Sequence, residues 1–160
     1  LHRVDRRQRQ MCIRDRWLGK WYITVLQLVY GMFMGWLLFK IHWGNHIVAI
    51  FIILLIWAAF NSALAVLLGS FAKSEGQVSA ISTISSLLLA ALGGCWWPIE
   101  VTPMWMQNLA QFLPTGWIMD ILHNLMYFGG QLQDISLQIM ALLILTSIAM
   151  VLAFNKFRYS

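Results

Sequence analysis

Residues Gly93 to Trp117 read GGCWWPIEVTPMWMQNLAQFLPTGW. This stretch begins inside an apolar run, and its three prolines then exclude one continuous helix. Tryptophan gathered beside long apolar runs is typical of a membrane–water boundary. We therefore predict a helix end, a turn, and two short interfacial or re-entrant helices over residues 103–112 and 117–127. Thr102 is the expected N-cap and Pro103 the first residue of the earlier helix.

The composition of the whole chain indicates a membrane protein. Of its 160 residues, 60% are hydrophobic and 11% are charged. A soluble domain is about half apolar and about a quarter charged. Because the net charge of +5 comes from arginines within residues 1–16, we predict no nucleic-acid partner. The fold class that follows is an all-α integral membrane protein.

Four apolar segments surround the Trp-rich stretch, three before it and one after it. Each approaches the roughly 20 residues that a helix needs to cross a bilayer. We predict four transmembrane helices within a transmembrane domain of residues 17–160, at residues 17–39, 46–70, 78–95 and 135–154.

The first 16 residues, LHRVDRRQRQMCIRDR, differ from the rest of the chain. They are basic and lack apolar periodicity, and they resemble translated adapter sequence. We expect residues 1–16 to be non-native or disordered; the alternative is a cytoplasmic tail that touches anionic membrane lipid. Cys12 and Cys95 are expected on opposite membrane faces, and therefore without a disulfide.

The distribution of Lys and Arg among the loops predicts the orientation. Positive charge gathers before the first span, in the second turn and at the C-terminus, whereas the Trp-rich stretch has none. We expect both termini to be cytoplasmic and the Trp-rich stretch to lie on the outer face.

Glycine pairs mark the expected sites of close helix packing. Gly31 and Gly35 are four residues apart, which is the spacing that lets another helix approach closely. Gly93 and Gly94 end the third apolar segment and permit a close backbone approach.

Polar residues within the apolar segments are candidates for a substrate path. Asn61 lies near the middle of its span, where its amide requires partners on other helices. Ser82 and Ser86 belong to a face of small hydroxyl side chains at helical spacing. Such residues either pack against a neighbouring helix or line a path, and the sequence leaves both interpretations open.

Two further clusters are weaker candidates. His42 and His46 are four residues apart but have no third ligand nearby, so we predict no metal site. Asp120 and His123 share one face of a short helix and could orient a general base, but no nucleophile stands beside them. A surface hydrogen bond is the preferred interpretation of this pair.

These residues carry a family resemblance. The sequence LGSFAKSEGQ at residues 68–77 is followed, after one span, by a glycine pair, a Pro-acidic-Pro stretch, a W-M-Q helix and a P-T-x-W turn within residues 93–125. This order resembles the membrane subunit of bacterial type-2 ATP-binding-cassette exporters. The resemblance covers residues 17–160.

The resemblance implies a six-span permease of the multidrug-export branch, of which this chain holds the last four spans. It implies a place in the bacterial inner membrane, a second permease subunit, identical or different, and cytoplasmic ATPase subunits. ATP and Mg²⁺ are expected on those subunits, because this chain has no GxxxxGK[ST] sequence and is not itself an enzyme. It implies efflux of a lipophilic or amphiphilic, drug-like or lipid-like substrate by alternating access. Glu100, Trp105 and Trp117 are the candidates for an outer gate.

Two other classes compete with this interpretation. A four-span membrane scaffold without transport requires residues 1–16 to be native and no ATPase partner to exist. An intramembrane enzyme requires an activated serine, such as Ser86, close to Asp120 and His123. The expected depths of Ser86 and His123 in the membrane disfavour the enzyme.

Overall fold

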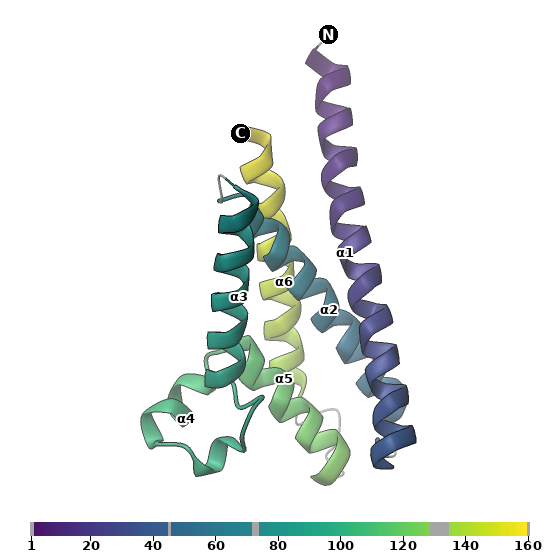
Figure 1. Ribbon diagram of the computed structural model, residues 1–160, viewed down its shortest axis with the longest axis vertical. Helices are drawn as coiled ribbons and strands as arrows, with labels where there is room; N and C mark the ends of the chain where they lie inside the picture. The colour runs from purple at the N-terminus through teal and green to yellow at the C-terminus, as the bar shows by residue number, and fades with distance from the viewer. Residues whose placement is uncertain (1, 45, 72–73, 129–134, 160) are drawn as a thin grey trace.

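The computed structural model describes residues 2–44, 46–71, 74–128 and 135–159, and over these residues every regular element is a helix (Figure 1). In chain order the elements are α1 (His2–Phe39), α2 (Ile47–Gly69), α3 (Glu75–Leu92), the 3₁₀ turn η1 (Ile99–Val101), α4 (Met104–Ala110), α5 (Pro114–His123), the π-helix η2 (Asn124–Phe128) and α6 (Ser136–Tyr159).

Three segments are long and apolar enough to cross a membrane: Trp17–Phe39 of α1, Ile47–Gly69 of α2 and Ser136–Ala153 of α6. Helix α3 contributes a shorter apolar segment, Gly76–Leu92. These lengths and compositions support the predicted all-α membrane architecture.

Helix α2 is the centre of the bundle, with its most extensive contacts to α6 and α1. Two indole groups of α1 attach that helix to α2. Trp17 Nε1 donates to the Ala59 carbonyl oxygen at 3.4 Å, and Trp21 Nε1 donates to the Leu55 carbonyl oxygen at 3.3 Å. The two rings are stacked, with centroids 6.2 Å apart. These tryptophans therefore orient α1 on α2.

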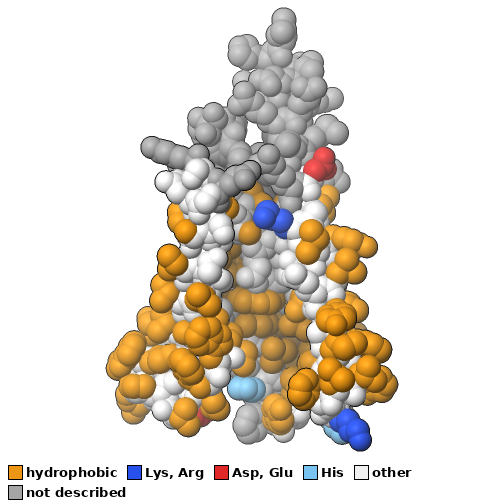
Figure 2. All heavy atoms as spheres, in the orientation of Figure 1, with side chains coloured by type: hydrophobic (Ala, Val, Ile, Leu, Met, Phe, Trp, Pro, Cys, Tyr) orange, Lys and Arg blue, Asp and Glu red, His pale blue; other side chains and the backbone are white. Residues whose placement is uncertain are grey.

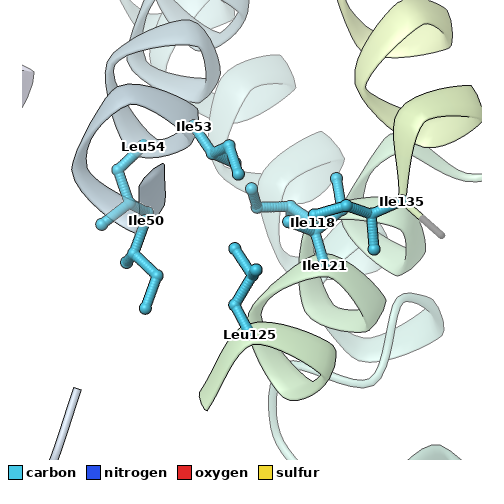
Figure 3. Packing of buried hydrophobic residues seen from close by; sticks show 7 residues of the cluster. All are labelled: Ile50, Ile53, Leu54, Ile118, Ile121, Leu125 and Ile135. Carbon is cyan, nitrogen blue, oxygen red and sulfur yellow. The ribbon is translucent and has the colours of Figure 1, made fainter. Parts of the chain in front are cut away.

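The main hydrophobic core lies between α2, α5 and the start of α6 (Figure 3). Isoleucine and leucine side chains from these elements point toward one another, and burying each removes apolar surface from solvent. The cluster comprises Ile50, Ile53, Leu54, Ile118, Ile121, Leu125 and Ile135. This core holds the short helices against the long ones.

Different elements form the two ends of the bundle. Helix α1 begins and α6 ends at the same end of the molecule, while α4 and α5 lie at the opposite end (Figure 1). We call the segment from η1 to η2 the cap. Helix α3 runs from the terminal end to the cap and stands across from α1 in this view.

Helix α3 is displaced by about one turn from the predicted segment 78–95. It begins at Glu75 because the Ser74 side chain accepts a hydrogen bond from the Gln77 backbone N–H at 3.3 Å, which caps the helix. It ends at Leu92, and Gly94 then adopts a φ of +78°. This left-handed conformation favours glycine and turns the chain into the cap.

Helix α1 extends back through the basic segment to His2, although disorder was the expectation for residues 1–16. Arginine and glutamine are good helix formers, which explains the continuous backbone helix. The non-native origin of this segment stays a prediction.

The cap also corrects two local expectations. The Thr102 hydroxyl donates to the Ile99 carbonyl oxygen at 2.6 Å and so closes η1 instead of capping α4, which begins at Met104. Pro114, expected in a turn, is the first residue of α5. Proline suits that position because its missing N–H is not needed there.

Candidate functional site

A pocket of about 650 Å³ opens between α1, α2 and α3. Figure 2 views the molecule on the face that is hollowed between α3 and α1, where hydrophobic side chains form much of the floor. We call it the main pocket. It is lined by Lys20, Ile23, Thr24, Trp57, Phe60, Asn61, Ser62, Leu64, Ala65, Leu68, Ser82, Thr83, Ser85, Ser86, Leu89, Ala90, Cys95 and Thr115.

The three candidate path residues all line this pocket, from two different helices. Asn61 Nδ2 donates to the Trp57 carbonyl oxygen at 2.9 Å, and the Ser86 hydroxyl donates to the Thr83 carbonyl oxygen at 3.0 Å. Both bonds lie within one helix, so neither residue uses its polar group to join two helices.

The wall formed by α2 is mainly apolar. Trp57 and Phe60 are stacked, with ring centroids 5.4 Å apart, and Leu64 and Leu68 continue the surface along the helix. A mostly apolar pocket with a few convergent polar groups is the usual form of a small-molecule site.

The pocket closes toward the cap where α3 meets α5. The buried Thr115 hydroxyl donates to the Leu89 carbonyl oxygen at 2.8 Å. A Cβ placed on Gly93 would overlap the Thr115 side chain, so this approach requires glycine. A Cβ on Gly94 would lie 3.3 Å from the Ile99 side chain, at the positive φ already described.

The three candidate gate residues are distributed over the cap. Glu100 and Trp105 are exposed, on η1 and α4. Trp117 Nε1 donates to the Gln111 carbonyl oxygen at 2.6 Å, which ties α5 to the end of α4. None of the three lines the main pocket as the described residues form it.

The glycine pair of α1 has no helix against it within the described chain. A Cβ on Gly31 would meet nothing within 4 Å, and one on Gly35 would meet Ile41 and Trp43 of the following loop. Packing of this pair against another helix stays a prediction.

Asp120 and His123 line a second, smaller pocket of about 140 Å³ in the cap, whereas Ser86 lines the main pocket. Burial raises the pKa of the Asp120 carboxyl, His123 opposes this effect and Glu100 adds to it. Since the structure does not bring Ser86 to this pair, it assembles no serine–histidine–aspartate site from them.

His42 faces a surface hollow near Lys40, and His46 precedes α2. Among the described residues, no three histidine, cysteine, aspartate or glutamate side chains gather as a metal site would require.

Sequence reasoning identified only Asn61, Ser82 and Ser86 among the residues of the main pocket, and three of those that it missed are informative. Lys20 is the one charged residue between Trp17 and Phe39, a signal that was visible in the sequence. Thr115 and Cys95 reach the pocket only because the chain turns back at Gly94, which spacing along the sequence does not reveal.

The chain is similar in sequence to known proteins. Residues 14–155 match the family model described as "ABC-2 family transporter protein". The chain is 27% identical over 98 residues to the linearmycin resistance permease protein LnrN of Bacillus subtilis strain 168, a match that covers 61% of this chain and 25% of that protein.

It is also 39% identical over 64 residues to YvfS of the same strain, which its name calls a transport permease without stating a substrate; this match covers 38% of the chain and 26% of YvfS. The matched segments thus span about a quarter of each relative. No solved structure matches the chain.

Proposed function

The chain belongs to the ABC-2 transporter family, and we propose that it is the membrane permease part of an ATP-binding-cassette exporter that moves a lipophilic or amphiphilic substrate outward. The main pocket carries this proposal. It combines an aromatic and aliphatic wall with hydroxyl and amide groups from Asn61, Ser82 and Ser86. An amphiphile has matching apolar and polar parts, and the volume lies within the usual range for ligand pockets of about 300–1,000 Å³.

The resistance function in the name of LnrN supports a drug-like cargo for the proposal. That name states linearmycin resistance for the relative. For this chain we propose the broader class, a membrane-partitioning compound or lipid, because the pocket lies between α3 and two helices, α1 and α2, that are long enough to span a membrane.

We propose four crossings, with α3 as the third. Its 18 residues give a helix of about 27 Å, close to the thickness of the hydrocarbon core, about 30 Å. We propose that both termini are cytoplasmic and that the chain lies in the bacterial inner membrane. The start of α1 and the end of α6 lie at the same end of the bundle, which supports the first of these points. The cap would then face outward, with Glu100, Trp105 and Trp117 forming part of its gate.

The energy source is proposed to lie on another chain. The family implies association with an ATP-binding-cassette ATPase, and no GxxxxGK[ST] sequence occurs in this one. We propose that ATP and Mg²⁺ bind to that partner, and that a second permease subunit completes the transporter. A complete permease of six spans is part of this proposal.

The experiment that tests the proposal measures efflux of Nile red, a fluorescent lipophilic dye. The full-length permease is expressed in a bacterial host with the cassette ATPase encoded beside its gene, or with an inactive form of that ATPase. We expect dye efflux only with the active ATPase. Equal dye retention with both forms would overturn the exporter assignment and favour the scaffold.

The same assay tests the path. Ser82→Leu and Ser86→Leu place bulk inside the main pocket and remove hydroxyls, so both should abolish ATPase-dependent efflux. Ser79→Leu is the matched control, because Ser79 is exposed on α3 and does not line the pocket. If all three variants export dye as well as the unmodified chain does, the substrate does not pass through this pocket.

A further inference from the structure

Lys20 has no charged neighbour among the described residues that line the main pocket. It lies near the start of the membrane-length segment Trp17–Phe39 and lines the pocket from α1. Its backbone oxygen accepts a hydrogen bond from the Thr24 hydroxyl at 2.9 Å. Its ammonium group makes no ion pair or hydrogen bond with the described part of the chain. A cation within a spanning segment normally faces an interior cavity and pairs there.

The pocket around Lys20 has a definite charge character. Lys20 is the one charged residue among the described lining residues, and it contributes a positive charge to the pocket. Lys20 is exposed at the pocket, where its charge attracts an anion and repels a cation.

Neutral polar groups on the other two helices face the same space. The Ser82 hydroxyl makes no hydrogen bond with the described residues, and Asn61 uses only Nδ2. The Asn61 Oδ1 and the Ser82 hydroxyl are therefore available to a bound molecule, across the pocket from α1.

We propose that the main pocket recognises an anionic amphiphile whose phosphate or carboxylate group pairs with Lys20. Its neutral polar groups lie against Asn61 and Ser82, and its apolar part lies on Trp57 and Phe60. This inference rests on the proposed function, since it names the class of molecule that the pocket takes. It distinguishes anionic from neutral and cationic compounds of equal apolar size.

Binding is tested without ATP and without the ATPase. Cys95 is exposed and lines the pocket, so its alkylation by a fluorescent maleimide reports occupancy. The full chain carries Cys12→Ser, which leaves Cys95 as its single cysteine, and is held in phosphatidylcholine nanodiscs. The probes are lysophosphatidic acid, oleate and neutral monooleoylglycerol, with oleoyl chains throughout.

We expect the two anions to protect Cys95 at concentrations about tenfold lower than the neutral probe. A hydrogen bond to a charged group contributes about 1.5 kcal/mol or more, which corresponds to that factor. Comparing lysophosphatidic acid with oleate then identifies the phosphate or the carboxylate as the preferred group.

Lys20→Gln should remove the preference for anions, whereas Lys20→Arg should retain it. Lys40→Gln is the matched control, because Lys40 directly follows Phe39, the last residue of α1, and lies outside the main pocket. Equal protection by anionic and neutral probes, or an unchanged preference in Lys20→Gln, would overturn the inference.

The result of the Cys95 protection assay can differ from that of the efflux assay, so the two hypotheses can fail independently. Selective protection by anions without ATPase-dependent efflux supports the anion site and refutes the exporter. Efflux of Nile red without any preference for anions supports the exporter and refutes the anion site.

Discussion

Replacing Gly116 with alanine tests the packing between α4 and α5. A Cβ at this buried position would overlap the Ala110 carbonyl oxygen and lie 2.9 Å from its carbonyl carbon. Both atoms belong to the backbone of another helix, so no side-chain rotation relieves the overlap. The substitution therefore requires α4 and α5 to separate.

The expected cost follows from the size of that overlap. Inserting one extra carbon into a well-packed interior costs about 1–3 kcal/mol when the backbone must shift. In a chain of this length, each kcal/mol lowers the melting temperature by about 2–4 °C. We expect Gly116→Ala to melt about 2–12 °C below the unmodified protein.

Gly19→Ala is the matched control. A Cβ there would meet nothing within 4 Å, and the residue lies inside α1. Alanine is favoured over glycine in a helix by about 0.5–1 kcal/mol, so this variant should melt at the same or a higher temperature. The measurement is the fraction of detergent-solubilised monodisperse protein that remains after heating, followed by size-exclusion chromatography.

The reasoning is refuted if Gly116→Ala melts together with Gly19→Ala. That result would mean that α4 and α5 do not approach each other as closely as described. A loss in both variants would equally refute it, because open space at Gly19 predicts no loss.

Three further predictions concern the cap. Thr115→Val should destabilise the chain by about 0.5–1.5 kcal/mol through loss of the hydrogen bond to Leu89, while Thr115→Ser retains it; thermal melting compares the two. Ile121→Ala should cost about 2–5 kcal/mol, since the side chain is fully buried and a cavity remains, and the same melting assay should show this as the largest loss among these cap variants. The raised pKa of Asp120 means that the folded state holds the proton to higher pH than the unfolded state, so stability should fall as pH rises from about 3.9 through the folded value. Melting temperatures of Asp120→Asn across this range should lack that fall, and an unchanged pH profile would contradict the assigned cause.

The long helices were predictable because composition alone determines them. Helix α2 lies within one residue of its predicted bounds at each end, since its apolar residues are bounded by polar loops. The end of α3 was harder to place because Cys95 continues the apolar run, while the conformation of Gly94 ends the helix. The hydropathy of the neighbouring residues does not predict the positive φ of Gly94.

The kind of site was predictable from the sequence, but only some of the residues that form it were. Hydroxyl and amide residues in apolar spans pointed to Asn61, Ser82 and Ser86, and these face one pocket. The position of Lys20 depends on the rotation of α1 about its axis, which the indoles of Trp17 and Trp21 determine through bonds to α2. A span that is apolar on all sides carries no periodic signal of this rotation.

The contact between Thr115 and the end of α3 has a mechanical consequence. The Thr115 hydroxyl donates a hydrogen bond to the Leu89 carbonyl oxygen, and its side chain lies directly against Gly93. These contacts hold α5 closely against α3. Helix α5 in turn carries Ile118 into the core shared with α2. A tilt of α3 would therefore displace α5 as well, and Ile118 would pass that displacement on to the core shared with α2.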